Sequence, residues 1–311
     1  MPRRTRKLRY TLITGDYYIL YPDLPRNGPQ PDGDTINFLP DDDDLVQNLP
    51  RFSGRAPERK HLGTYNVRFE GIDALETHYQ NRHQNLEFAE AARDRMLKLM
   101  GFGRVQFWPN QRNNVKSAQH HPIRGHLIAN GIESNGRVLG LVYPGAPDAN
   151  LNNGERVFVD EARLEASVNA ALVREGLAYA ELYATMPLDL IKRMRQLVKA
   201  AREAGTGFWP RENLTRNTRI QLSGLSDLPD MVMLPKLYRR LVKYFEDGYV
   251  GLTEFDVWVR ADKTTRDDRA LLPTGELGNL HDLYDLSNGG IKLQYFPEDL
   301  TFDPDPPRSQ A

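Results

Sequence analysis

Three short apolar segments of this chain carry charged residues at or near their ends, and this pattern limits the folds that the chain can adopt. The segments span residues 32–39, 67–77 and 136–143. Short strands of this kind are typical of a small barrel. Acidic side chains and arginines at strand ends are the groups that hold a hard cation against a phosphate. The pattern therefore indicates a protein that cuts nucleic acid.

The candidate metal ligands are Asp34, Asp73 and Ala74. Calcium prefers carboxylate and carbonyl oxygens in a flexible shell. Asp34 and Asp73 can each supply a carboxylate, and Ala74 can supply its backbone carbonyl, for which the identity of the side chain does not matter. The sequence thus predicts a calcium site and leaves another divalent cation open.

Arg68, Arg137 and Glu76 are the candidate catalytic residues. Phosphodiester cleavage requires that charge on the phosphoryl oxygens be neutralised, and a planar guanidinium binds phosphate through two nitrogens and stays charged. A carboxylate near the metal can orient or deprotonate the attacking water. Strand alternation places Arg68 and Asp73 on opposite faces, so we expect a twist or bulge near Gly71 to bring them together.

Four motifs in order give the chain a resemblance to a known family. They are D-G-D-T at 32–35, V-R-F-x-G-I-D-x-x-E-T at 67–77, N-G-R at 135–137 and V-N-x-A-L-V-R-E-G-L-A at 168–178. This order, closed by Gly207-Phe208-Trp209, resembles the staphylococcal nuclease (thermonuclease-like) family. The resemblance covers residues 30–210, about two thirds of the chain.

The resemblance implies the same roles for these residues. It places a metal at Asp34, Asp73 and the Ala74 carbonyl, phosphate at Arg68 and Arg137, and water activation at Glu76. Asp32 and Thr35 are expected beside the metal and not as firm ligands. Family members cut at the 5′-oxygen and leave 3′-phosphates. We expect single-stranded DNA or RNA as the substrate, since the bases must be splayed at the mouth of the barrel.

The chain departs from the family pattern at several positions near this site. Glu70 follows Arg68 by two positions, where the family prefers an apolar residue, and Leu75 replaces a proline. Asn135, with Ser134 before it, replaces a tyrosine that helps to hold a terminal phosphate, so we expect Asn135 at the substrate. Tyr179 and Tyr183 lie where nucleotide-stacking tyrosines are expected.

The expected fold is α+β: an OB-fold-type five-stranded β-barrel with about three packed helices, followed by a C-terminal α/β extension. Helical periodicity predicts helices at 85–100, 161–175, 187–204 and 234–244. Apolar runs predict strands at 105–108, 123–128, 138–143, 255–259 and 291–296, and a hairpin within 10–21. The segment 110–122 reads as a polar insert.

We divide the chain into a basic N-terminal arm and hairpin at 1–29, the nuclease-like domain at 30–210, an extension of unknown role at 211–300 and a disordered tail at 301–311. Residues 211–311 contain 17 acidic and 13 basic residues, whereas the remainder is mildly basic. Five basic residues among the first nine are expected either to contact phosphates or to form a solvated tail.

Composition excludes several classes of protein. There are no cysteines, which excludes disulfides and cysteine-ligated zinc. No stretch approaches the ~20 apolar residues of a membrane span, and the apolar run after the basic N-terminus is too short for a signal sequence. We therefore expect a cytoplasmic location and no membrane partner.

Two alternatives to a nuclease stay open. One is a nuclease-derived binding module that has lost catalysis. The other is an interaction protein in which residues 211–300 bind a protein partner. In that case the acidic extension could also cover the barrel mouth as a nucleic-acid mimic and restrain cleavage.

Overall fold

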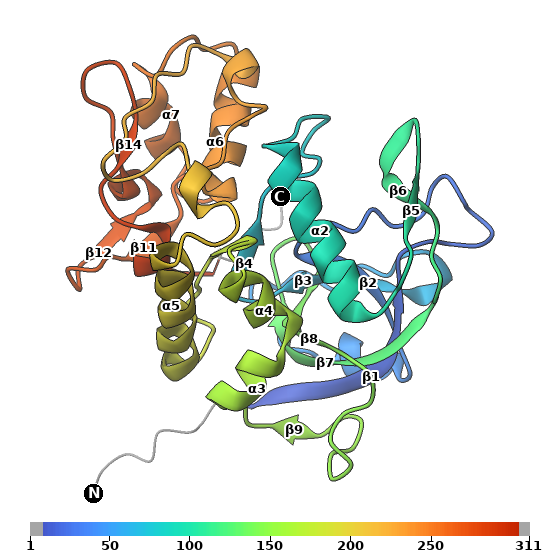
Figure 1. The fold of residues 1–311 in the computed structure, drawn as a ribbon. Helices are drawn as coiled ribbons and strands as arrows, with labels where there is room; N and C mark the ends of the chain where they lie inside the picture. Colours follow the sequence, from blue (N-terminus) through green and yellow to red (C-terminus); the bar gives the residue numbers. More distant parts are fainter. Residues whose placement is uncertain (1–8, 305–311) are drawn as a thin grey trace, which may run out of the picture.

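A computed structural model describes residues 9–304, which contain a closed five-stranded β-barrel with helices packed around it (Figure 1). The pairing of β1 with β2 closes the sheet, and β3 runs parallel to β8. This is the α+β fold of OB type that the motif order predicts. Around the barrel the strands are β1 (Tyr10–Tyr18), β2 (Thr35–Pro40), β3 (Tyr65–Phe69), β8 (Val138–Pro144) and β7 (Ile123–Ile132).

The prediction of a hairpin within residues 10–21 is wrong, because residues 10–18 form the single strand β1. This strand pairs with β2 on one side and β7 on the other, and β9 (Arg156–Val157) extends the sheet at its start. Gly15 is not a turn residue. A Cβ at this position would clash with the Leu39 carbonyl oxygen, so glycine is required for β2 to lie this close. The basic residues before Arg9 lie outside the described residues.

Helices cover the barrel on the side that faces the extension. The predicted helices at 85–100 and 187–204 are confirmed as α2 (Leu86–Met100) and α5 (Leu188–Glu203). The one predicted at 161–175 is divided into α3 (Glu161–Ala166) and α4 (Val168–Arg174). Ser167 divides them because its backbone is extended and its hydroxyl accepts a hydrogen bond from the Ala170 amide, which starts a new helix.

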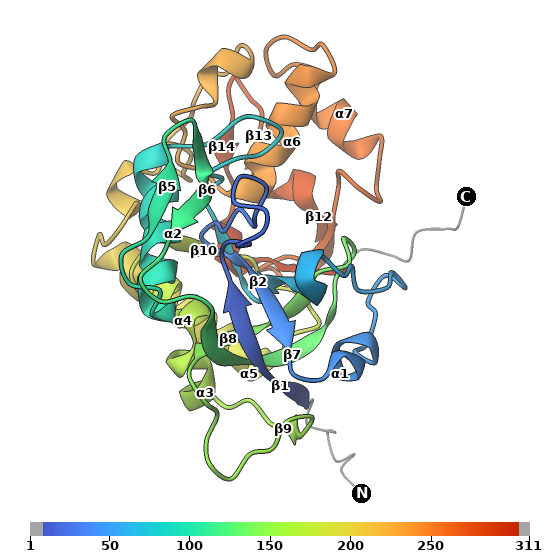
Figure 2. The same ribbon diagram turned by 90° about the vertical axis from the view of Figure 1, so that its right-hand side faces the viewer.

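Two insertions leave the barrel. Much of the predicted polar insert at 110–122 is a strand, β6 (Gln111–Ser117), which pairs with β5 (Gln106–Trp108) to form a hairpin beside α2 (Figure 2). The acidic run at 41–44 leads into a short helix, α1 (Asp43–Gln47), capped by the Asp42 carboxylate. A further short pair, β4 (Ile72–Ala74) and β10 (Ala178–Ala180), lies at one end of the barrel.

The extension combines two helices with short strand pairs (Figure 1). The predicted helix at 234–244 is confirmed as α6 (Pro235–Glu246). The strand predicted at 255–259 is wrong: it is the helix α7 (Phe255–Arg260), in which Phe255, Trp258 and Val259 share a buried face at helical spacing. The strands are β11 (Arg269–Leu271), β12 (Leu277–Asn279), β13 (Tyr284–Asp285), β14 (Lys292–Leu293) and β15 (Thr301–Phe302).

The predicted disordered tail begins too early. Thr301 and Phe302 form β15, which pairs with β11, and both residues are buried. Phe302 also bridges to Tyr183 of the barrel domain. The final residues of the predicted tail, 305–311, lie outside the described residues. The extension is therefore fastened to the barrel domain by the end of its own chain.

Asn169 of α4 ties three parts of the barrel domain together. Its fully buried side-chain amide donates hydrogen bonds to the carbonyls of Glu70 and Gly140, at 2.9 and 3.1 Å, and its oxygen accepts one from the Val142 amide at 3.0 Å. It thus holds the turn after β3, the strand β8 and the helix in one arrangement. These contacts fix the backbone that carries the candidate catalytic residues.

We expect Asn169→Ala to lower the free energy of unfolding by about 2–3 kcal/mol, because it removes hydrogen bonds from buried backbone groups. Urea denaturation measures the loss. Asn150→Ala, at an exposed residue of the loop before β9, is the control and should change stability by less than ~0.5 kcal/mol. Equal stability of the two variants would contradict the structural role of Asn169.

Candidate active site

A tight turn brings Arg68 and Asp73 together. Strand β3 ends at Phe69, Glu70 and Gly71 form the turn, and Asp73 follows in β4. Gly71 has a φ of +80°, a left-handed conformation that glycine adopts without strain. The Arg68 Nη2 atom lies 2.7 Å from the Asp73 Oδ1 atom. The bend predicted near Gly71 is confirmed.

Arg68 is buried among three carboxylates. One terminal nitrogen pairs with Asp34, and the other pairs with Asp73 and, at 3.1 Å, with Glu181. The side chain of Arg68 is 10% exposed. Both ends of the guanidinium are therefore occupied by the protein itself.

Asp34 is fixed by its neighbours in the D-G-D-T turn and by β4. Its Oδ2 atom accepts a hydrogen bond from the Ala74 amide at 2.7 Å, and its Oδ1 atom accepts one from the Thr35 hydroxyl at 3.1 Å. The Asp32 carboxylate accepts from the Asp34 amide. Burial raises the pKa of Asp34, but the Arg68 guanidinium outweighs burial and leaves this pKa below its ordinary value.

Arg239 of the extension completes the cluster. Its guanidinium contacts both oxygens of Asp73, at 3.2 and 3.0 Å, and the Glu76 Oε1 atom at 2.5 Å. The contact is possible because α6 packs beside β4 (Figure 1). The motif analysis did not identify Arg239. A signal was present, since Lys236, Arg239 and Arg240 stand at helical spacing and so share one face of the predicted helix.

The same helix face extends the ion network away from Arg68. Lys236, 4% exposed, pairs with Glu181 at 3.0 Å and with Asp268 at 3.4 Å. Arg240 pairs with Asp268 at 2.8 Å. Burial raises the pKa of Glu181, but Lys236 and Arg68 outweigh it and hold this pKa well below its usual range. At this cluster the extension presents three basic side chains of α6 together with the Asp268 carboxylate. That the acidic extension covers the barrel mouth as a nucleic-acid mimic stays a prediction.

Carboxyl groups outnumber cationic side chains in this cluster. Six carboxylates meet four cationic side chains, namely Asp32, Asp34, Asp73, Glu76, Glu181 and Asp268 against Arg68, Lys236, Arg239 and Arg240. Burial and the carboxylates of Asp34 and Glu76 raise the pKa of Asp32 well above its ordinary value. Burial, with Asp73 and Asp34 nearby, raises the pKa of Glu76 to about 7. Glu76 thus changes protonation near neutral pH, which suits a general base.

Arg137 and Asn135 are held by Glu133 at the turn between β7 and β8. The Arg137 Nε atom lies 3.2 Å from the Glu133 Oε1 atom, and the Asn135 Nδ2 atom lies 3.0 Å from the Oε2 atom. Arg137 is 30% exposed and its charge lowers the pKa of Asp34. It is the predicted phosphate-binding arginine with the greater access to solvent.

A cleft of about 490 Å³ opens beside these residues. It lies between the loop that joins β1 to β2 and the segments before β3 and after β4. Asp32 and Thr35 line it from the D-G-D-T turn, His78 from the segment after β4, and Arg137 from the turn between β7 and β8. The cleft gives a substrate access to Arg137 and to the edge of the carboxylate cluster.

The two predicted stacking tyrosines do not face this cleft. Tyr179 is fully buried, stacks on Phe208 and donates a hydrogen bond to Glu212, so the prediction that it binds a nucleotide is wrong. Tyr183 packs against Phe302, and its hydroxyl contacts Glu181 and Lys236. It belongs to the contact between barrel domain and extension.

Residues 66–211 match the family described as staphylococcal nuclease homologues. This stretch of the chain is therefore similar to staphylococcal nuclease homologues, as the order of the motifs predicts. The match begins in β3 and ends with the short 3-10 helix at Trp209–Arg211, so it includes Arg68, Asp73, Glu76 and Arg137. No curated protein matched the chain. No helix within residues 9–304 is long and apolar enough to span a membrane.

The donor chemistry of the cluster fits a hard divalent cation. Asp34 and Asp73 offer only oxygen atoms, and the surplus of carboxylates favours a bound cation. Within residues 9–304, however, no three acidic or histidine side chains form a ready cage, since Arg68 and Arg239 stand among the carboxylates. A cation therefore gains these oxygens only where a guanidinium releases them.

Glu70 does not pair with Arg68. Its buried carboxyl accepts hydrogen bonds at Oε1 from the Tyr10 hydroxyl, at 3.1 Å, and from the Asn130 amide, at 2.5 Å, while Oε2 has no partner. Burial raises the pKa of Glu70 to about 7. The departure from the family pattern at this position thus leaves Arg68 unaffected and places a titratable group inside the barrel.

Glu70 should make the protein less stable as pH rises. Its pKa is about 7 in the folded state and 4.5 as the ordinary value, so the folded state binds its proton more tightly between these pH values. We expect wild type to lose up to about 3 kcal/mol relative to Glu70→Gln between pH 4.5 and 7. Urea denaturation at several pH values measures the difference. The control is Glu276→Gln, at an exposed glutamate. A stability difference between wild type and Glu70→Gln that does not change with pH would contradict the assignment.

Proposed function

We propose that the barrel domain hydrolyses phosphodiester bonds of single-stranded DNA or RNA in a calcium-dependent reaction that leaves 3′-phosphates. The observation that carries the proposal is the position of Glu76. Its carboxyl has a pKa of about 7 and lies among the Asp34 and Asp73 carboxylates, in a domain of nuclease homologues. A base of this pKa works near neutral pH.

In the proposed reaction Glu76 takes a proton from water as the water oxygen attacks phosphorus. The bond from phosphorus to the 5′-oxygen breaks, and that oxygen takes a proton from solvent. The phosphate stays on the 3′-oxygen of the upstream fragment, and the downstream fragment leaves with a 5′-hydroxyl. Arg137, which lines the cleft and is 30% exposed, binds the phosphoryl oxygens and stabilises the charge that develops on them.

Asp34, Asp73 and the Ala74 carbonyl would hold the calcium ion, with Asp32 and Thr35 beside it. When bound, the ion neutralises phosphoryl oxygens and lowers the pKa of water. Arg68 is less suited to bind phosphate directly, because three carboxylates already occupy its guanidinium. We propose that Arg68 positions Asp34 and Asp73 and favours their ionised forms against the effect of burial.

Cleavage of labelled single-stranded DNA and RNA, with calcium or with a chelator, tests this proposal. We expect calcium-dependent cutting that falls by about 10²–10⁴ in Glu76→Gln and by about 10²–10³ in Arg137→Ala. Arg260→Ala, at an arginine on the exposed face of α7, is the matched control and should cut like wild type. Cutting by Glu76→Gln at the wild-type rate would exclude Glu76 as the base.

The rate of cleavage should rise with pH through about 7. The pKa of Glu76 is raised to about 7, so its carboxyl is largely protonated at lower pH and cannot accept the proton of water. We expect kcat to fall about tenfold for each pH unit well below 7. A flat profile of kcat between pH 5 and pH 8, with the protein shown to be folded, would contradict this role.

A second candidate function is a nucleic-acid-binding module without catalysis. One observation favours it: Arg239 holds Asp73 and Glu76, the groups needed for metal binding and water activation. Binding of single-stranded nucleic acid without cleavage in any divalent cation would select this candidate. The possibility that residues 211–300 also bind a protein partner stays a prediction.

A further inference from the structure

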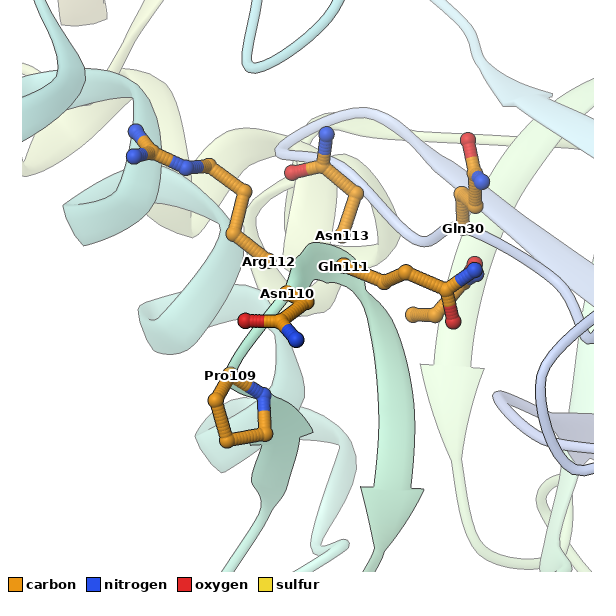
Figure 3. Close-up of a pocket in the computed structure, with 7 residues that line it drawn as sticks. Gln30, Pro109, Asn110, Gln111, Arg112 and Asn113 are labelled. Carbon is orange, nitrogen blue, oxygen red and sulfur yellow. The ribbon is translucent and has the colours of Figure 1, made fainter.

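The β5–β6 hairpin belongs to a stretch of the chain without negative charge. No acidic residue stands between Asp94 and Glu133, although the whole chain has 42 of them. Arg112 and Lys116 of the hairpin are both exposed. Figure 3 shows Arg112 at the hairpin tip, where its side chain extends to the side opposite Gln30. Lys116 lies instead where the hairpin meets the loop between β1 and β2.

Two cations gather on one tryptophan at this meeting point. The Arg26 guanidinium, from the loop, lies 4.5 Å from the centre of the Trp108 ring, and the Lys116 ammonium lies 5.4 Å from it. The two charges are therefore no farther apart than about one Debye length, ~10 Å, so they repel each other. Within residues 9–304 neither cation forms an ion pair. This unbalanced pair of charges indicates a site for an anion.

Contacts between the hairpin and the loop hold the two cations in place. Trp108 donates a hydrogen bond from Nε1 to the Pro25 carbonyl at 2.7 Å. Asn114 is 5% exposed and donates from Nδ2 to the Arg26 carbonyl at 2.8 Å. The side chains of Arg26 and Lys116 are nevertheless exposed. The pair is thus fixed by the fold and accessible from solvent.

The pair of cations adjoins the cleft of the candidate active site. Asn27, the residue after Arg26, lines that cleft together with Arg137. A nucleic-acid strand with one phosphate at Arg137 can therefore leave the cleft beside Arg26. A guanidinium also matches the geometry of a phosphate group with its forked N–H donors. Position and chemistry together favour a phosphate of the same strand over an acidic protein.

We propose that Arg26 and Lys116 form a second phosphate-binding site, which contacts the backbone of the substrate strand outside the cleft. The identity of the ligand rests on the proposed function. A phosphate bound between the two cations offsets their repulsion. Contacts to phosphate carry no information on base sequence, so the site strengthens the binding of any strand long enough to reach it. A dinucleotide in the cleft does not reach it.

The salt dependence of binding tests this proposal on full-length protein that carries Glu76→Gln, in the presence of a chelator. One fluorescent probe is a single strand of about 12 nucleotides, and the other is a dinucleotide. Arg26→Gln with Lys116→Gln should lower the slope of log affinity against log salt by about 1.4 for the long strand, since each phosphate contact on a single strand contributes about 0.7. The slope for the dinucleotide should not change.

Lys243→Gln with Arg260→Gln is the matched control. It removes the same charges from exposed positions of α6 and α7, on the opposite side of the molecule from the hairpin (Figure 1). The control should keep the slope of the parent for both probes. Lys116→Gln alone removes no hydrogen bond and should lower the slope by about 0.7, so it decides the question if Arg26→Gln disturbs the loop.

An unchanged slope for the long strand, an equal change in the control or an equal change for the dinucleotide would overturn the second phosphate site. So would a labelled polyglutamate peptide that binds more tightly than the long strand and loses that binding in the double variant, because the site would then serve an acidic protein. A wild-type protein that cleaves nothing would refute the proposed nuclease, while the comparison of slopes would still decide the site.

Discussion

Asp73 is held by two guanidinium groups at once, and much of the structure depends on this arrangement. Arg68 reaches it from β3 of the barrel and Arg239 reaches it from α6 of the extension. Asp73 is 1% exposed, so its charge is stable there only because both partners stay in place. Removal of one partner from a buried ion pair costs about 3–5 kcal/mol. The geometry of the site and the docking of the extension therefore depend on each other, and a change to either affects the other.

The extension is acidic in composition, but it contributes positive charge at the barrel domain. Residues 211–311 have a surplus of acidic groups, yet the face of α6 toward the barrel domain presents Lys236, Arg239 and Arg240. These groups offset part of the negative charge that a nuclease site collects for a metal. Arg239 thus occupies carboxylate oxygens that a cation would use. On the proposed function, the rate of cleavage would depend on how readily Arg239 gives up those oxygens.

Local pattern was enough to predict the barrel, its main helices and the convergence of Arg68 with Asp73, because these follow from motif order and from a glycine turn. Prediction from local pattern failed where tertiary contacts decide the structure of a segment. Residues 10–18 form one strand because both of its edges are paired, and residues 255–260 form a helix because one helical face is buried. Tyr179 was misassigned because its side chain packs on Phe208 and bonds to Glu212, contacts that no local motif shows. Arg239 lies 166 residues from Asp73 in sequence, so no local motif could join them.

The central claim is that the Arg239 guanidinium occupies carboxylate oxygens that a bound cation would use. Calcium titration of the full chain tests this claim most directly. Calorimetry would compare wild type with Arg239→Gln and with Arg240→Gln, a control on the same helix that pairs with Asp268 instead. We predict that Arg239→Gln binds calcium at least about tenfold more tightly than the other two, since loss of one guanidinium frees oxygens of Asp73 and Glu76. Addition of Asp34→Asn should abolish that gain. Equal calcium affinity in folded wild type and Arg239→Gln would contradict the account.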